Sequence, residues 1–419
     1  MGSQLAADCR PLDLDGVRDM LAARAVLRER LGGPPDGWRV SEVGDGNLNL
    51  VYIVEGPGGA LCVKQALPYV RAAGPSWPMT PERAFYENAY FAAVAPHVGG
   101  LIPAIHHYDP AQYCLVMERL SPHIILRLGL ISGRRYPLVA SHLGDYVARA
   151  CFFTSDLAEP FERKLQRTAL FAGNQALVRI SVDLIFTDPY CVSPRNRHTS
   201  PELDALAEEF RADSALRIAA ARFGQRFLSD AQALLHGDLH SGSVMVTESD
   251  SRVIDPEFAF YGPIGFDLGA FLGNLLLSWY SQPGHSSAAD DRAAYREWIL
   301  EQARDFWETF RHRFLALWSE YSGGDAFPQR MFSRARDASA LRAAQESFVD
   351  SVFADMLGFA ACKMIRRILG FAHVRDFEAI ENRPLRAHCE VGALQLARRL
   401  LTQPRRFQSM EDVFDVLAA

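Results

Sequence analysis

The chain has 419 residues, of which 49% are hydrophobic and 22% charged, and its formal net charge is −6 at pH 7. That length and apolar content suffice for two domains, or for two lobes of one domain, with a sizeable core. The basic residues are scattered along the chain, which argues against nucleic-acid binding. Seven cysteines without a CxxC pair indicate the reduced thiols of a cytosolic protein, neither a disulfide framework nor a zinc site.

Hydrophobic segments give no sign of a membrane partner. The start of the chain lacks an apolar signal core, because Asp8, Arg10 and Asp13 interrupt it. The longest apolar stretch, residues 266–280, is interrupted by Asp267 and Asn274 and is short for a transmembrane helix, so we expect a buried helix there. The protein is therefore expected to be soluble and cytoplasmic.

Short apolar alternations follow an N-terminal helix in the first third of the chain. The helix is expected over residues 15–31, because Gly32-Gly33-Pro34-Pro35 is a strong stop signal. A second helix is predicted from Thr80, as its N-cap, through Ala95, with Pro81 at the first helical position. The alternations, separated by turn residues, predict five strands of one antiparallel sheet: residues 38–43, 48–55, 60–65, 105–108 and 113–117.

Helical patterns dominate the rest of the chain. Helices are predicted at residues 138–154, 203–212 and 215–235, and over nearly everything after residue 266. A strand hairpin that carries carboxylates interrupts them. The order of elements predicts an α+β fold with two lobes, arranged as in protein kinases, in which the N-terminal lobe is small and β-rich and the C-terminal lobe is large and mostly helical. The expected boundaries are residues 1–117 for the first lobe, 118–122 for a hinge and 123–419 for the second lobe.

The most informative segment is Leu235-His236-Gly237-Asp238-Leu239-His240, which places a carboxylate in a turn after a short apolar run. A second apolar run leads to Ile254-Asp255-Pro256-Glu257. This is the layout of a phosphoryl-transfer site, in which one acid orients and deprotonates the attacking hydroxyl and others hold magnesium. A lone aspartate in such a turn is as often a helix cap. The downstream acids and an upstream lysine favour Asp238 as the catalytic base.

Asp255 and Glu257 are the candidate magnesium ligands. Mg²⁺ prefers hard oxygen donors and usually takes one or two carboxylates, with phosphate oxygens and water at its other positions. Residues i and i+2 at the end of a strand project to the same side, so both carboxylates can face one metal site. Apolar residues flank the pair on both sides, and two unpaired acids would be costly to bury without a counterion. This disfavours an ordinary surface turn.

Two further segments fit a nucleotide site. Lys64 follows the apolar residues 61–63, so it projects from a predicted strand. A lysine there would bind the α- and β-phosphates and pair with a helix glutamate, for which Glu87 is best placed, whereas the alternative is a snorkelling surface lysine. The turn Gly44-Asp45-Gly46-Asn47-Leu48-Asn49 could cover phosphates with its backbone amides, although it is no GxGxxG match and Asp-Gly is equally a hairpin signal.

These residues resemble those of the methylthioribose kinase family. That family lies within the aminoglycoside phosphotransferase and choline kinase group, which is similar in fold to protein kinases. The resemblance is carried by residues 236–240 and 253–274, where the block DPEFAFYGP is specific to the subfamily. Further matching blocks cover nearly the whole chain: residues 43–50, 63–71, 76–78 and 365–367.

The resemblance implies ATP, Mg²⁺, a small-molecule sugar substrate and a homodimer. It equates Asp255-Pro256-Glu257 with the metal-binding triplet of protein kinases and singles out Asn47 as a nucleotide contact. Glu118-Arg119-Leu120, at the predicted hinge, would present backbone groups to adenine. Ser243 departs from the wider group, which has asparagine there as a ligand of a second Mg²⁺. Glu257 would then take over that duty, and whether Ser243 contacts metal stays open.

The substrate side rests on one tryptophan and three arginines. Trp77, in a loop rich in turn residues, either pins its loop or closes over an apolar group, and the resemblance favours a lid over a methylthio substituent. Arg366 and Arg367 are adjacent on a predicted helix, so one can face solvent while the other reaches inward to sugar hydroxyls, phosphate or a salt-bridge partner. The resemblance favours Arg367 within this pair and adds Arg386 as a second substrate contact.

Taken together, these observations predict a kinase that phosphorylates the anomeric 1-hydroxyl of S-methyl-5-thioribose with Mg-ATP, in methionine salvage. Asp238 would orient that hydroxyl and so also contact the sugar. Two alternatives stay open. An aminoglycoside or choline kinase would need an acidic surface for its cationic substrate, where this chain offers arginines. A nucleotide-binding pseudokinase is favoured by Ser243 alone.

Overall fold

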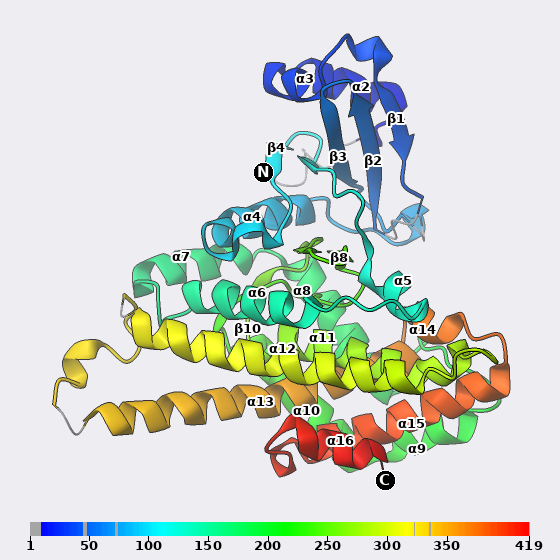
Figure 1. Cartoon of the computed structure of the whole chain (residues 1–419), viewed down its shortest axis with the longest axis vertical. Coiled ribbons are helices and arrows are strands. Elements are labelled where there is room, and N and C mark those ends of the chain that lie inside the picture. Colours follow the sequence, from blue (N-terminus) through cyan, green and yellow to red (C-terminus); the bar gives the residue numbers. More distant parts are fainter. Residues whose placement is uncertain (1–9, 45–47, 72–73, 322, 335–336, 419) are drawn as a thin grey trace.

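An antiparallel sheet forms the N-terminal part of the computed structural model, which describes residues 10–44, 48–71, 74–321, 323–334 and 337–418. Its strand order is β1-β2-β3-β5-β4 (Figure 1). Alternate residues of the long central strands face one core, as their apolar pattern predicts. The five predicted strands are confirmed with small shifts at their ends: β1 (Arg39–Glu42), β2 (Asn49–Gly56), β3 (Gly59–Ala66), β4 (Ile105–Asp109) and β5 (Cys114–Glu118).

The N-terminal helix is broken in two, where one helix was predicted. The segments are α2 (Leu14–Ala22) and α3 (Ala25–Leu31). Arg24 between them has extended backbone angles, φ −114° and ψ 111°. Its guanidinium donates to His107 Nε2 (2.7 Å) and to Asp109 Oδ2 (2.5 Å) on β4. A tertiary contact therefore outweighs the local helical pattern, while the predicted stop after residue 31 is confirmed.

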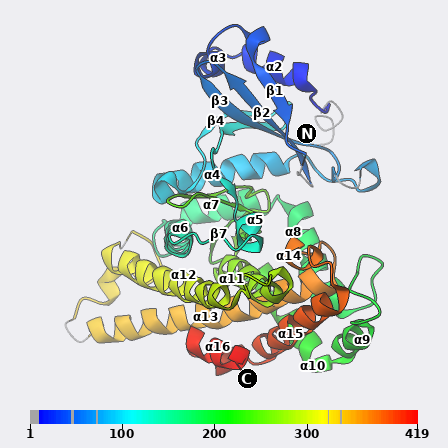
Figure 2. The same cartoon turned by 45° about the vertical axis from the view of Figure 1, so that its right-hand side comes forward.

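The helix that packs beneath the sheet begins later than predicted. It is α4 (Arg83–Val98), so Thr80 is not its N-cap and Pro81 is not its first residue. The Thr80 hydroxyl accepts a hydrogen bond from Glu82 N (3.2 Å), and the Thr80 carbonyl accepts one from Arg83 Nη1 (2.8 Å). Because a side chain occupies that carbonyl, the first helical turn starts beyond it. α4 lies between the sheet and the remaining helices (Figures 1 and 2).

Helices make up most of residues 126–418. In chain order they are α5 (Leu126–Ile131), α6 (Val139–Phe153), α7 (Phe161–Phe171), α8 (Gln175–Ser181), α9 (Asp204–Ala212), α10 (Ser214–Ser229), α11 (Gly265–Ser281), α12 (Ala293–Glu320), α13 (Asp337–Leu369), α14 (Arg375–Glu378), α15 (Arg383–Thr402) and α16 (Met410–Ala418). The predicted fold class, a small β-rich N-terminal part followed by a large and mostly helical part, is confirmed.

Two small sheets interrupt these helices, which corrects the predicted helix over residues 215–235. That helix ends at Ser229, and Ala233–Leu235 form strand β7, paired with β10 (Phe260–Gly262). A short buried apolar run looks the same in a helix and in a strand, so the sequence could not separate them. The other sheet joins β6 (Ile124–Ile125), β8 (Val244–Val246) and β9 (Ser251–Val253). β8 and β9 form the predicted hairpin.

Helix α11 is the buried centre of the helical part, as its apolar stretch predicts. It packs against α12, α13 and α15. A Cβ on Gly269 would lie 2.6 Å from Met356 O of α13, and one on Gly265 would lie 2.8 Å from Met356 N. Glycines thus allow the two backbones to approach closely, which fixes the position of α13 relative to the turns that follow β7 and β9.

Neither membrane spans nor disulfides are found among the described residues. No single described helix has the length and apolar content to cross a membrane, while the bent pair Phe161–Phe171 and Gln175–Tyr190 meets that test on length and composition. Six of the cysteines lie in the described ranges and all six are free thiols.

Candidate active site

The turn between β7 and β8 holds Asp238 in a fixed backbone. Asp267, in the first turn of α11, accepts hydrogen bonds from His236 N (2.7 Å) and Gly237 N (3.0 Å). Gly237 has a φ of +83°, and a Cβ there would lie 2.2 Å from Phe258 O. Only glycine fits this position, because any side chain would collide with the backbone of the neighbouring loop. The turn is therefore built to aim one carboxylate.

His236 and Ser243 connect this turn to the second acidic motif. Asp238 N donates to His236 Nδ1 (3.2 Å), so the ring proton is on Nε2, which donates to Ile254 O (2.9 Å) directly before Asp255. The Ser243 hydroxyl donates to Asp238 O (3.0 Å). It closes the turn that carries the aspartate, which gives this serine a structural use.

A lysine and a histidine flank the Asp238 carboxylate, and burial holds the pKa of the histidine, His240, well below its usual value. Lys363 Nζ of α13 lies 2.8 Å from Oδ1, and His240 Nε2 lies 3.4 Å from Oδ2. Burial alone would raise the pKa of Asp238, but Lys363, His240 and Arg366 outweigh it and hold the pKa of that carboxyl well below its usual range. Asp238 is therefore ionised at neutral pH and can accept a hydrogen bond from a hydroxyl.

Lys64 is the centre of a second cluster, which contains three carboxylates. Its Nζ lies 2.6 Å from Glu87 Oε2 of α4, so the ion pair predicted from the sequence is present, and it also pairs with Asp255 Oδ1. Burial would lower the pKa of Lys64, but Asp255 and Glu87 outweigh it and raise that pKa above its usual value. Burial also raises the pKa of Glu87 to about 7.

The three carboxylates of this cluster have a donor set that fits a hard divalent cation. One oxygen each of Glu87, Asp255 and Glu257 lie within 4.8 Å of one another. Glu87 Oε1 and Glu257 Oε1 are buried and have no hydrogen-bond partner among the described residues. Such oxygens are the ligands that Mg²⁺ takes in proteins. The predicted pair of ligands is thus brought together, with Glu87 as a third neighbour.

A buried arginine fixes Glu257. Arg83 is fully buried, and its Nε lies 3.2 Å from Glu257 Oε2, which also accepts from Asn49 Nδ2 (2.9 Å). The same guanidinium donates to Leu67 O (2.8 Å) and Leu48 O (3.0 Å). Arg83 thereby ties β2, the loop after β3 and the acidic motif to the start of α4.

Replacement of Arg83 by methionine should lower the free energy of unfolding by about 3–5 kcal/mol, because it leaves Glu257 buried without its cation. The measurement is urea-induced unfolding followed by circular dichroism. As a control, Arg313→Met removes an arginine that is 44% exposed and paired with Asp145 on the helical face, and it should cost less than about 1 kcal/mol. Equal losses in both variants would contradict the structural role of Arg83.

Gly44 and Glu118, two of the remaining predicted nucleotide contacts, lie at the ends of strands of the sheet. Gly44 is exposed and follows β1, while Gly46 and Asn47 lie outside the described residues. Glu118 ends β5, and Arg119 pairs with Glu55 of β2. The backbone groups of Glu118, Arg119 and Leu120 therefore lie where β5 passes into the helical part.

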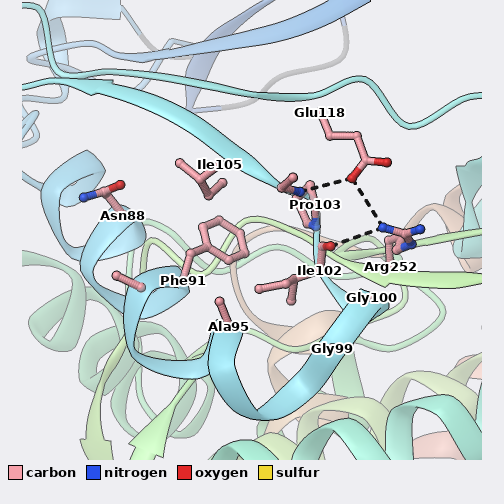
Figure 3. A pocket seen from close by; sticks show the side chains of 12 residues that line it. Asn88, Phe91, Ala95, Gly99, Gly100, Ile102, Pro103, Ile105, Glu118 and Arg252 are labelled. Carbon is pink, nitrogen blue, oxygen red and sulfur yellow. Dashed lines mark hydrogen bonds and ion pairs between the residues drawn. The ribbon is translucent and has the colours of Figure 1, made fainter.

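A cavity of about 500 Å³ adjoins Glu118 (Figure 3), and none of the three clustered acids is among the residues that line it. α4, the segment 99–105 and Arg252 line it together with Glu118. Glu118 Oε2 accepts hydrogen bonds from Ala104 N (3.1 Å) and Arg252 Nη1 (3.3 Å). Because this network engages the side chain, a contact of Glu118 with adenine would use its backbone, as predicted.

Trp77 bridges the two parts of the chain. Its ring centroid lies 5.1 Å from that of Phe371, which follows α13, with the planes inclined at 51°. The Trp77 backbone is also held, because Val70 N donates to Trp77 O (3.0 Å) and Trp77 N donates to Gly74 O (3.1 Å). The loop thus carries an aromatic side chain from the sheet to the end of the helix that bears Lys363.

The arginines predicted to hold the substrate fall into two places. Arg367 is buried and donates to Ala372 O (2.8 Å), whereas Arg366 is half-buried, and both lower the pKa of Asp238. Arg386 instead lines a second cavity of about 270 Å³ and pairs with Glu390 (3.0 Å). No contact among the described residues joins Arg386 to Asp238.

Several residues of the site were not singled out from the sequence. Lys363 lies one turn before the arginine pair in the same apolar helix, and a charged residue in that context was the available signal. Asp267 and Arg83 gave none, because their partners are backbone groups and a glutamate far along the chain. Arg127 of α5 also reaches this region and pairs with buried Asp376 (3.4 Å).

Comparison with known proteins places these features in a family. The phosphotransferase enzyme family matches residues 39–308, so the chain is a member of that class. Methylthioribose kinase 1 of Oryza sativa subsp. japonica is 45% identical over 96% of this chain and 94% of its own length. Methylthioribose kinases of Escherichia coli (44% identical, 99% and 98% covered) and Klebsiella pneumoniae (41% identical, 91% and 93% covered) are similar along comparable lengths. Within the phosphotransferases, the chain belongs to the methylthioribose kinase family.

Proposed function

We propose that this protein is an ATP-dependent kinase that phosphorylates the 1-hydroxyl of S-methyl-5-thioribose, giving S-methyl-5-thioribose 1-phosphate in methionine salvage. The observation that carries the proposal is 45% identity to a methylthioribose kinase over 96% of the chain. The geometry supports it, because an ionised aspartate among cations faces one side of the site and three carboxylates surround Lys64 on the other.

Asp238 would bind and orient the hydroxyl of the acceptor. The acceptor hydroxyl donates a hydrogen bond to this carboxylate, and its oxygen attacks the γ-phosphorus in line with the departing β-phosphate oxygen. The new oxygen–phosphorus bond forms as the old one breaks, ADP leaves, and the hydroxyl proton passes to Asp238. A carboxylate with so low a pKa is a weak base, so its main task is orientation, with proton transfer late.

The cluster around Lys64 would bind the nucleotide. Lys64, held by Glu87, binds the α- and β-phosphates, and Gly44 with the adjoining turn covers them. Asp255 and Glu257 would hold Mg²⁺, which would offset the negative charge of the phosphate groups. We place the nucleotide-binding lobe at residues 1–117, the hinge at 118–122 and the catalytic lobe at 123–419.

The sugar would lie between Asp238 and the arginine pair. Arg366 Nε and Arg367 Nε are buried without hydrogen-bond partners among the described residues, so both guanidinium groups have donors available for sugar or phosphate oxygens. Arg386 stays a predicted contact. We also infer a homodimer from the family resemblance and a cytoplasmic location from the free cysteines.

Trp77→Ala should raise the ATP hydrolysis measured without acceptor by about fivefold or more relative to sugar phosphorylation, because an open site admits water. Loss of its contact with Phe371 should also raise the KM for the sugar. The measurement is ADP release with and without methylthioribose. Trp318→Ala, remote on α12, is the control for loss of a buried tryptophan. A Trp77 variant with unchanged coupling would exclude a lid.

The first test of the function is ADP production from Mg-ATP with four acceptors offered separately: 5-methylthioribose, ribose, choline and kanamycin. Turnover with 5-methylthioribose alone is expected. Turnover with choline or kanamycin would mean that the proposed substrate is wrong and that the proposed reaction class is right. Tight ATP binding without turnover on any acceptor would favour the pseudokinase.

A further inference from the structure

Lys363 is a buried cation in contact with the carboxylate of Asp238. Only 2% of its side chain is exposed, and Nζ donates to Asp238 Oδ1 at 2.8 Å. The ammonium group also lies over the Phe266 ring, 4.6 Å from its centroid. Two elements thus enclose it, the turn after β7 and the first residues of α11.

The contact fixes which carboxylate oxygen is available. A hydrogen bond of 2.8 Å between charged groups is strong and directional, so Lys363 occupies one lone pair of Oδ1 and leaves Oδ2 the more open oxygen. Among the described residues, the polar atom near Oδ2 is His240 Nε2, at the longer distance of 3.4 Å. The acceptor hydroxyl would therefore meet Oδ2.

The charge around Asp238 exceeds what a structural ion pair needs. Arg366 and Arg367 follow Lys363 by about one turn on α13, so three cations of one helix act on a single carboxylate. Burying like charges together is unfavourable unless an anion joins them. The transferring phosphoryl group is such an anion, and the cluster lies where it would arrive.

We infer that Lys363 is a positioning residue of phosphoryl transfer, which holds the Asp238 carboxylate ionised and turned so that Oδ2 receives the acceptor hydroxyl. This inference rests on the proposed function for its substrate. Lys363 keeps its proton throughout. The hydroxyl proton goes to Asp238, the γ-phosphorus gains the acceptor oxygen, and ADP departs.

The alternative is that Lys363 only stabilises the fold. The chain offers a matched comparison, because Lys164 of α7 is also buried, pairs with Asp156 and lies over the ring of Tyr261 at 5.9 Å. The two lysines therefore share burial, a carboxylate partner and an aromatic contact. They differ in that Asp156 is not part of the proposed catalytic machinery.

The first experiment compares Lys363→Met, Lys363→Arg and Lys164→Met. We expect Lys363→Met to lower kcat about 10²-fold with less than about a threefold change in the KM for the sugar, because it disturbs orientation in the transition state. Lys363→Arg should recover at least about a tenth of the wild-type kcat, since the guanidinium preserves the charge. Lys164→Met should stay within about threefold. Equal kcat values for the two methionine variants, at matched melting temperatures, would overturn the inference.

A double-mutant cycle tests whether Lys363 acts through Asp238. In the Asp238→Asn background, Lys363→Met should change the residual kcat less than about threefold, because the group that it positions is already gone. A full 10²-fold loss in that background would mean that Lys363 acts on its own, and positioning would be wrong.

The pH profile gives a readout that a structural lysine would not move. Burial lowers the pKa of Lys363 to about 8, and besides Asp238 its titratable neighbours are Arg366 and Arg367 on its own helix, Asp267 of α11, and His236 and His240 of the turn after β7. Since the ammonium form is the active one, kcat/KM for the sugar should fall as pH rises through about 8. In Lys363→Arg this limb should disappear, because arginine stays charged. Its persistence would assign the limb to another group.

The free energy of unfolding should rise with pH as Lys363 titrates, whereas kcat/KM should fall. The pKa of Lys363 is lower in the folded chain than in the unfolded one, so the unfolded state binds more protons between pH of about 8 and 10. The contribution of Lys363 to the free energy of unfolding therefore rises over that interval. Activity and stability that fall together there would mean that unfolding causes the loss.

Failure of the proposed substrate leaves this inference testable. If another acceptor is turned over, the same variants are compared with that acceptor. If none is, carbon-13 NMR of labelled aspartate measures the carboxyl directly. The pKa of Asp238 should then rise by at least about one unit in Lys363→Met, because the closest cation is lost. No rise would contradict the inference independently of activity.

Discussion

Replacing Asp238 with asparagine is expected to lower kcat about 10³-fold or more, with the KM for ATP changed less than about threefold. Asparagine keeps the size of the side chain but loses the charge and the proton acceptor. The contact at 2.8 Å from Lys363 then loses its anion. The chain should still fold, because burial already lowers the pKa of Lys363 to about 8 and the lysine can release its proton.

The measurement is the initial rate of ADP formation at saturating ATP and sugar, together with the melting temperature. Asp156→Asn is the matched control, because it also removes an anion from a buried lysine, Lys164. That control should keep kcat within about threefold. If the Asp238→Asn enzyme retains more than a tenth of the wild-type kcat, Asp238 is not the catalytic base.

Local patterns predicted the strands of the sheet and the two acidic motifs well. Burial alternates along most of β2 and along the first half of β3, and Asp238 and Asp255 each follow a short apolar run. These signals need no distant partner, because period-two burial and turn chemistry are properties of a few neighbouring residues. The pairing of Lys64 with Glu87 also followed, since a strand and the next helix lie close together in this order of elements.

Predictions failed where a distant side chain decides the local structure. Arg24 breaks the first helix by reaching β4, and Arg83 delays the start of α4 by occupying a carbonyl. The strand β7 depends on pairing with β10, which follows the turn that carries Asp238 in the sequence. In each case the contact that outweighs local propensity joins segments that the sequence does not show to be neighbours.

The contact between Lys363 and Asp238 could not be predicted from the sequence for the same reason. Lys363 contacts Asp238 because α13 packs closely on α11, where Gly269 permits the approach. A lysine in an apolar helix signals only that it needs a partner. The partner's identity comes from packing, so the positioning of the base could be inferred only once both helices were in place.

Replacing Asp255 with asparagine is expected to lower kcat about 10²- to 10³-fold and to raise the Mg²⁺ concentration for half-maximal activity about tenfold or more. Asp255 has a φ of +69°, a left-handed conformation that asparagine tolerates, so the substitution leaves the backbone unstrained. Its side chain is 44% exposed, and Lys64 keeps Glu87 as a partner. The effect should therefore be on metal dependence and not on folding.

Titration of activity with Mg²⁺ at fixed ATP is the measurement. Asp250→Asn serves as the control, because Asp250 belongs to the same hairpin and accepts from Arg252 Nε (2.7 Å) away from the acid cluster. Its Mg²⁺ dependence should match that of the wild type. If Asp255→Asn loses activity with an unchanged Mg²⁺ titration, Asp255 acts through its pair with Lys64 and the metal site must be built from Glu257 and Glu87. A shifted titration in Asp255→Asn alone assigns the metal to Asp255, because it is the exposed carboxylate among the three clustered acids.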